Sequence, residues 1–378
     1  MSHATVSSGK RSLTGNETTL VTCMGLSARV FAFAMTLITF AFLTNNYLIF
    51  WQGWPGTAGL FSHLQWFGYE PLRDPLDAGA VVQAWAQWLS YPLMVVLAAV
   101  YVLRVKDRCL HVDGARLSTL AAYIVRACFW AVLLVGVADG AISFLRVEEA
   151  LPSLVGQTLT QELGRPNFRG EYVHLPLILL SFGIAAFVQR IDFIWLSLLV
   201  VFAEFLIVIS RFVFSYEQAF MADLVRFWYA ALFLFASAFA LIEEGHVRVD
   251  VFYARFGKRG KAWANTLGCL LLGLPLCWVI LVEGASGKGA SIVSPLLSYE
   301  ISQSGFGMYV KYLMAAFLLV FAVSMIIQFS AYILEAVADL RDEPGEHREY
   351  DPLHLADAEI GHEMRQAGQV GQSGGGAG

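Results

Sequence analysis

Three charged residues interrupt long apolar stretches of this sequence. Arg126 and Glu204 lie well inside such stretches, and Asp139 lies near the end of one. A charge in hydrocarbon is costly, so residues of this kind usually line an ion or proton pathway or pair with each other inside the protein. We expect a buried Arg126–Glu204 pair that fixes helix packing, because a lone pair satisfies itself without a relay. An ion or proton pathway is the alternative.

The histidines and cysteines give little support for a cofactor. A b-type haem usually needs paired histidines on packed helices, and the apolar stretches contain His174 alone. The five cysteines show no metal-ligand spacing. We therefore expect no metal and no cofactor. A haem- or quinone-associated membrane anchor subunit of a redox enzyme remains the alternative function.

Catalytic signatures are missing as well. The sequence contains no Walker loop, no H-E-x-x-H and no C-x-x-C. It also has no basic stripe of the kind that binds nucleic acid, and its net charge is −5. We expect neither an enzyme nor a nucleic-acid-binding protein.

The most specific pattern spans two consecutive apolar segments and the polar residues after them. The first segment ends at Arg211-Phe212, and the second opens with Asp223 and Arg226. It is followed by Gly245-His246-Val247-Arg248-Val249-Asp250. Gly245 permits the backbone conformation that ends a helix. The alternating polar and apolar residues after it suit a segment at the membrane interface. This segment either only caps the helix or also contacts a partner subunit.

The pattern resembles the small membrane subunit, of DctQ type, of the tripartite ATP-independent periplasmic (TRAP) transporters. In that family the first helix ends in an Arg–aromatic pair, and the second opens with an acid shortly before an Arg. The second helix closes with a Gly-His-hydrophobe-Arg-hydrophobe-Asp motif. The resemblance covers residues 191–340. It departs from the family in two respects: Asp223 stands alone where two acids are common, and four apolar segments precede the ordinary subunit.

The resemblance implies a role without a substrate site in this chain. It implies a small permease subunit that braces the large membrane subunit (DctM type) and helps to dock a periplasmic binding protein during ion-coupled uptake of an organic acid. The implied location is the bacterial inner membrane, with lipid as a further partner. The matching residues comprise a subunit-contact motif and a set of helix-end charges: Gly245, His246, Arg248 and Asp250, and Arg211, Asp223 and Arg226.

These residues must be positioned by membrane helices. A helix needs about 20 mainly apolar residues to cross the bilayer, and in lipid only a helix satisfies the backbone of an isolated segment. We predict an all-α polytopic protein with eight such helices: Ala28–Trp51, Ala80–Leu103, Ser118–Phe144, Tyr172–Gln189, Phe193–Ser215, Leu224–Ile242, Ala262–Val282 and Tyr309–Leu334.

The distribution of Lys and Arg predicts the orientation. Sixteen of these residues fall in the segments on the side of the two termini and eight on the other side, with Arg126 inside a helix. Because cytoplasmic loops carry the excess of Lys and Arg, both termini should lie in the cytoplasm, as an even number of helices requires. The three long loops on the other side, 52–79, 146–171 and 283–307, should be external and hold short amphipathic pieces.

The composition agrees with lipid as the solvent. Hydrophobic residues make up 57% of the chain and charged residues 15%, whereas soluble domains carry about 25% charged residues. We expect four parts: a polar cytoplasmic tail (1–27), a four-helix membrane extension (28–190), a DctQ-like four-helix domain (191–340) and a flexible polar tail (341–378).

Overall fold

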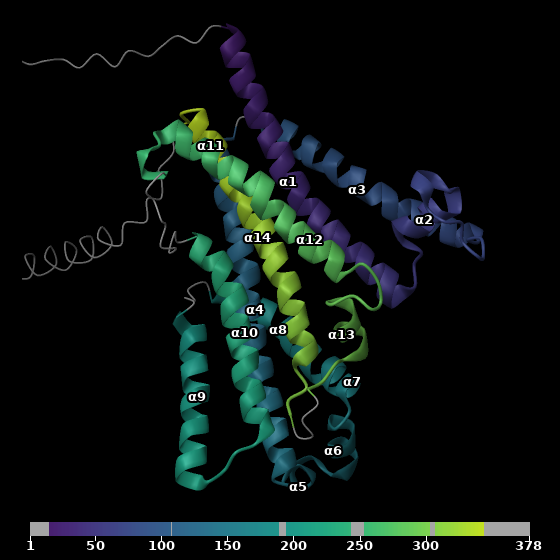
Figure 1. Ribbon diagram of the computed structural model, residues 1–378, viewed down its shortest axis with the longest axis vertical. Coiled ribbons are helices and arrows are strands. Elements are labelled where there is room, and N and C mark those ends of the chain that lie inside the picture. The colour runs from purple at the N-terminus through teal and green to yellow at the C-terminus, as the bar shows by residue number, and fades with distance from the viewer. Residues whose placement is uncertain (1–14, 107, 189–193, 243–252, 303–306, 344–378) are drawn as a thin grey trace, which may run out of the picture.

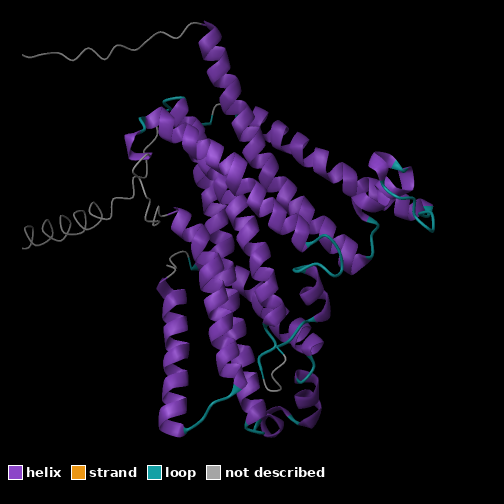
Figure 2. Cartoon of the chain, viewed as in Figure 1, coloured by secondary structure: helices purple, strands orange, loops and turns teal. Residues whose placement is uncertain are grey.

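The computed structural model describes residues 15–106, 108–188, 194–242, 253–302 and 307–343, and within these ranges all the regular structure is helical (Figures 1 and 2). Eight helical stretches are long and apolar enough to cross a membrane. They confirm the eight predicted helices, since each overlaps one of them: Cys23–Gln52, Ala78–Arg104, Leu110–Val147, Pro166–Phe187, Ile194–Phe214, Ala219–Ser237, Lys258–Gly284 and Lys311–Leu340. The cytoplasmic position of the termini stays a prediction.

Helices α4 (Leu110–Val147) and α14 (Lys311–Leu340) form the centre of the bundle. Helices α8 (Leu175–Phe187) and α10 (Ala219–Ile242) pack against α4, and α1 (Gly15–Gln52) packs against α14. Helix α14 is the most buried of the eight, which is expected of a helix surrounded by others rather than by lipid.

Two helices form the margins of the assembly. Helix α9 (Ile194–Phe214) packs mainly against α10, and α3 (Ala78–Arg104) packs against α1 (Figure 1). Both margins expose large apolar side chains, for example Val201 with 63% of its surface and Val82 with 68%. Such surfaces suit contact with acyl chains or with other membrane helices.

The N-terminal four helices and the C-terminal four share one hydrophobic interior. One buried cluster joins Leu117 and Ala121 of α4 to Ile326 and Leu334 of α14. A second joins Phe129 and Val132 of α4 to residues of α10 and α14. The two sets of helices therefore interleave rather than forming two separate bundles.

Two of the eight stretches contain a π-helical turn just before a proline. The turn η2 (Gly170–His174) links α7 (Pro166–Arg169) to α8, and η4 (Cys269–Gly273) links α11 (Lys258–Gly268) to α12 (Leu274–Gly284). Proline has no N–H for the preceding turn, and a π-turn re-registers the backbone locally.

Short helices occupy the three long loops. Helix α2 (Gly56–Leu64) and the 3₁₀ turn η1 (Trp66–Gly68) lie between α1 and α3. Helices α5 (Leu151–Val155), α6 (Gln157–Leu163) and α7 follow α4, and α13 (Val293–Ser298) precedes α14. In Figure 1 α5, α6, α7 and α13 gather at the lower end of the bundle. A further short turn, η3 (Tyr253–Arg255), precedes α11.

Helix α1 differs from the expected start of the first membrane segment. It begins at Gly15, although residues 1–27 were expected to form a polar tail. Hydropathy locates the part of a helix that crosses lipid, whereas a helix can continue into water as long as its backbone bonds persist.

Candidate functional site

A buried carboxylate near the C-terminal end of α4 accepts hydrogen bonds from several segments of the chain. Asp139 on α4 is fully buried, and its Oδ1 accepts a hydrogen bond from Arg169 Nη1 at 2.8 Å. Its Oδ2 accepts the backbone amide of Tyr309 at 2.8 Å. Arg169 is itself fully buried and donates from Nε to the carbonyl of Leu163 at 2.6 Å and from Nη1 to Ser143 Oγ at 3.2 Å. Both Asp139 and Arg169 thus make hydrogen bonds beyond the ion pair itself, as buried charges require, while Arg169 Nη2 is buried without a hydrogen-bond partner.

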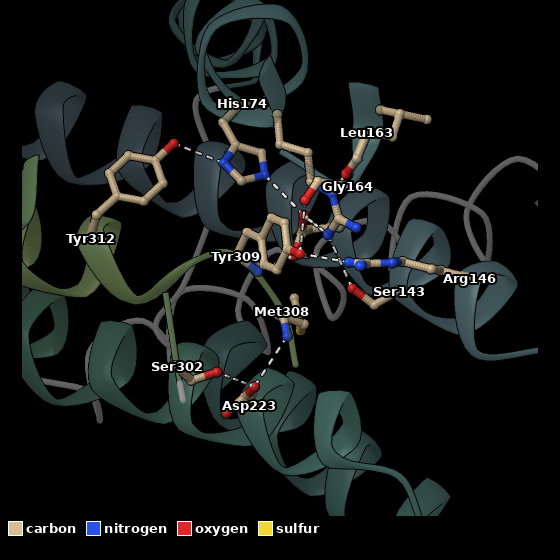
Figure 3. A network of polar contacts seen from close by, with 12 residues as sticks. Ser143, Arg146, Leu163, Gly164, His174, Asp223, Ser302, Met308, Tyr309 and Tyr312 are labelled. Atoms are coloured by element: carbon tan, nitrogen blue, oxygen red, sulfur yellow. Dashed lines mark hydrogen bonds and ion pairs between the residues drawn. The ribbon is translucent and has the colours of Figure 1, made fainter. Parts of the chain in front are cut away.

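The imidazole of His174 completes the environment of Asp139. Its Nε2 lies 3.2 Å from Asp139 Oδ1, and its Nδ1 lies 2.8 Å from the hydroxyl of Tyr312 (Figure 3). His174 has no exposed surface. Because both ring nitrogens are engaged, the ring cannot ligate a haem iron without breaking one of these bonds.

Tyr309 connects this carboxylate to the short helices. Its hydroxyl accepts a hydrogen bond from Arg146 and donates one to the carbonyl of Gly164 at 3.1 Å (Figure 3). The guanidinium of Arg169 lies over the Tyr309 ring, 4.1 Å from its centroid. Tyr309, in the segment before α14, is therefore held through its backbone amide, the face of its ring and its hydroxyl.

A second carboxylate holds the same segment from α10. Asp223 Oδ2 accepts a hydrogen bond from Ser302 Oγ at 2.8 Å and from the backbone amide of Met308 at 3.1 Å. Asp223 was singled out from the sequence as a helix-end charge, and 7% of its surface is exposed. Its side chain anchors the start of α14, which the sequence pattern did not indicate.

The other helix-end charges are more exposed. Arg226 lies 3.6 Å from Asp223, with 71% of its side chain exposed. Arg211 lies 3.4 Å from Glu217 in the turn between α9 and α10, with 61% of its side chain exposed. Exposed pairs of this kind contribute little to stability, at most about 1 kcal/mol each in water.

The motif Gly245, His246, Arg248 and Asp250 lies outside the described residues. The structure describes the helix before it, α10, and the turn η3 and helix α11 after it.

The expected pair between Arg126 and Glu204 does not form. Arg126 is half-buried on α4, and its Nε is buried without a hydrogen-bond partner. Glu204 is exposed on α9. The ring of Phe144 on α4 meets that of Tyr216 just beyond α9. Arg126 lies 18 residues before Phe144, and Glu204 lies 12 residues before Tyr216. At 1.5 Å per residue, this difference of six residues places the two charged side chains about 9 Å apart along the helix axes.

A second buried ion pair lies at the opposite end of α4. Arg29 on α1 donates from Nε to Asp113 Oδ2 at 2.7 Å, and the two side chains are 2% and 0% exposed. The remaining Arg29 nitrogens donate to the carbonyls of Val105 and Lys106 at the end of α3, at 2.8 and 3.2 Å. One guanidinium thus ties three helices of the N-terminal half together.

The N-terminus of α4 is held by a residue from the end of α14. Glu343 accepts hydrogen bonds from the backbone amide of Leu110 at 2.9 Å and from Cys109 Sγ at 3.0 Å. A carboxylate is favourable at a helix N-terminus. Burial, together with the neighbouring Glu343 carboxylate, raises the pKa of the Cys109 thiol.

Sequence reasoning missed most members of these clusters. Arg29 and Arg169 were counted only as flanking charges, and Tyr309 and Tyr312 were not singled out. Asp139 and His174 were noticed separately but not joined. The contacts of Asp139 link residues 30 to 170 positions apart, so no local spacing could reveal them. Groups of three or more metal-binding side chains do not occur among the described residues.

Comparison with known proteins gives one family. Residues 197–339 match the family described as "Tripartite ATP-independent periplasmic transporters, DctQ component". The matched region runs from α9 to the end of α14 and includes Asp223, Tyr309 and Tyr312, but not Asp139, Arg169 or His174. Neither a curated protein nor a solved structure matches the chain.

Proposed function

We propose that this chain, whose residues 197–339 match the DctQ component of the TRAP transporters, is a small permease subunit. It would brace the large membrane subunit and help to dock the periplasmic binding protein during ion-coupled uptake of an organic acid. The complex would lie in the bacterial inner membrane. The proposed parts of the chain are a tail (1–27), four added helices (28–190), the DctQ-like helices (191–340) and a second tail (341–378).

The observation that carries the bracing role is the interleaving of the two sets of helices. Helix α14, from the matched region, packs between α4 and α1 of the added helices. Buried ion pairs lie at both ends of α4, namely Arg29–Asp113 and Arg169–Asp139. A bundle fixed at both ends resists the tilting and sliding that a moving partner would impose on it.

The large subunit would bind to the motif Gly245, His246, Arg248 and Asp250. The segment after the motif is tied to the end of α14, since Lys258 lies 3.6 Å from Asp339 and Arg259 lies 3.4 Å from Asp342. A contact made by the motif would therefore be coupled to the central helix. This supports a role beyond capping α10.

The binding protein would be received by the loop between α1 and α3. Aromatic rings are exposed in this loop and at the end of α1 before it: Phe67 is 82% and Trp66 42% exposed in the loop, and Trp51 of α1 is 44% exposed. Aromatic side chains are enriched in protein interfaces and at membrane surfaces. Deleting residues 57–76 should abolish docking, and unchanged docking would remove this part of the proposal.

The proposal is tested by purifying the tagged chain from its native membranes in mild detergent. A small permease subunit should co-purify with one larger membrane chain in a fixed ratio and should be colourless. Recovery of the chain alone, or with a haem- or quinone-containing enzyme, would contradict the proposal and favour the redox anchor.

A further inference from the structure

Glu204 is an acid at the midpoint of a helix whose surroundings are apolar. Helix α9 runs from Ile194 to Phe214, so Glu204 lies ten residues, or about 15 Å, from either end. If α9 crosses the bilayer, this carboxylate lies at the centre of the hydrocarbon. Ionisable groups at that depth almost always face the protein interior and have a partner.

Glu204 neither faces the interior of the bundle nor has a polar partner among the described residues. Its side chain is exposed, and the described residues offer it no hydrogen bond and no ion pair. Helix α9 buries its other side, through Leu196 and Ala203. Glu204 therefore points away from the bundle, where only lipid or another protein can meet it.

Three further residues of α9 lie on the same side of the helix as Glu204. Val201, Glu204, Val208 and Arg211 recur at intervals of three and four residues and so share one side of the helix. Val201 is 63% exposed and Val208 49% exposed. We call these four residues the Glu204 face.

We infer that the Glu204 face is the surface by which this chain binds a helix of the large membrane subunit, and that this helix presents a lysine or arginine side chain to Glu204 at mid-membrane depth. The inference rests on the proposed function and adds to it the face and the chemistry of the contact. Charge complementarity selects the partner, because only a cation or a strong donor offsets a carboxylate removed from water.

Photo-crosslinking tests the inference in the intact chain. Benzoylphenylalanine replaces Val201 in the tagged full-length protein, which is expressed together with its native partner genes, irradiated in membranes and analysed by mass spectrometry. The expected product joins Val201 to the large subunit, at an apolar segment that contains Lys or Arg. The same probe at Leu179 on α8, which is 64% exposed, should give at least about fivefold less of this product, since only the Glu204 face is matched to the partner.

Substitutions at Glu204 test the charge. Glu204→Gln should lower the yield of crosslinked and co-purified large subunit by about tenfold or more, because truncating one member of a buried charge pair is costly. Glu204→Asp should restore part of the yield. Glu162→Gln removes an acid on α6, outside the Glu204 face, whose described ion pair is with Arg165, and should change nothing. Melting temperatures should be nearly equal in all three variants, because the described residues offer Glu204 no hydrogen bond or ion pair and the Glu162–Arg165 pair is exposed.

Three results would overturn the inference while leaving the proposed function in place: a product of Val201 with lipid alone, a product with a second copy of this chain, or an unchanged yield in Glu204→Gln. Each of them counts against the inference only if the wild-type chain still co-purifies with the large subunit. Loss of that co-purification in the wild type would instead contradict the proposed function itself.

Discussion

Asp139 and Asp223 lie on different helices and accept hydrogen bonds from two consecutive backbone amides, those of Tyr309 and Met308, at 2.8 and 3.1 Å. Asp139 precedes the region that matches the family, and Asp223 lies within it. The start of α14 is therefore a junction between the two parts of the chain. This relationship explains why the parts fold as one bundle and where that bundle should be most sensitive to substitution.

Asp139→Asn should be strongly destabilising. The change leaves an acceptor for the Tyr309 amide but removes the charge that balances the fully buried Arg169. Breaking a buried pair in this way costs about 3–5 kcal/mol in soluble proteins. The free energy of unfolding can be measured by SDS titration in mixed micelles.

A matched control for Asp139→Asn is Glu162→Gln. Glu162 pairs with Arg165 at 2.9 Å, but the two side chains are 34% and 69% exposed. Its loss should cost less than about 0.5 kcal/mol. Equal effects of the two substitutions would show that the Asp139 pair does not hold the bundle together.

Asp223→Ala should loosen the start of α14. It removes the acceptor of the Met308 amide, and an unsatisfied buried donor costs about 1–3 kcal/mol. Hydrogen exchange at the Met308 amide should become faster, while exchange at the Tyr309 amide changes less. Arg226→Ala, which removes only an exposed neighbour of Asp223, should leave both amides protected. Equally fast exchange in that variant would argue against the anchoring of Met308 by Asp223.

Gly136→Ala should separate α4 from α10. A Cβ at Gly136 would overlap the indole of Trp228, whose Nε1 donates to the carbonyl of Val132 at 3.3 Å. Overpacking of this kind typically costs about 1–3 kcal/mol. Gly140→Ala lies one turn further along α4, where an added Cβ meets nothing within 4 Å, so it should be neutral or stabilising by up to about 1 kcal/mol. A stable Gly136→Ala variant would refute the close approach of the two helices.

The Cys109 thiol should titrate above its ordinary pKa. Burial raises this pKa, and the Glu343 carboxylate raises it further. Because a raised pKa lowers the thiolate fraction at neutral pH, maleimide should label Cys109 slowly at pH 7.5 and faster as the pH rises. In a variant with Cys109 as its single cysteine, Glu343→Gln should move this rate profile to lower pH. A profile that Glu343→Gln leaves in place would contradict the contact.

Much of the fold follows from hydropathy, because the length of an apolar run directly reflects the thickness of the bilayer. All eight helices were predicted in this way. Their ends were not: α4 begins at Leu110 rather than at Ser118, since polar residues such as Asp113 can continue a helix where they find partners. Asp113, which pairs with Arg29 of α1, lies in this unexpected part of α4.

The contacts between helices could not be predicted from hydropathy. A hydropathy profile does not show how each helix is rotated about its own axis or how far one helix is shifted along another. The expected Arg126–Glu204 pair illustrates this. Both residues were correctly assigned to membrane helices, yet their different heights and sides keep them apart. The partners of Asp139 lie up to 170 positions away, and only the folded chain brings them together.

We propose that the motif Gly245–Asp250 faces the cytoplasm, where the large subunit would bind to it. The most direct test is to determine on which side of the membrane each end of the α11–α12 span lies. Gly257 and Gly289 flank the span Lys258–Gly284, and an added Cβ at either meets nothing within 4 Å. In a cysteine-free background, an impermeant maleimide should label Gly289→Cys in intact cells and Gly257→Cys only after the inner membrane is permeabilised. Labelling of both in intact cells, or of Gly257→Cys alone, would contradict the account.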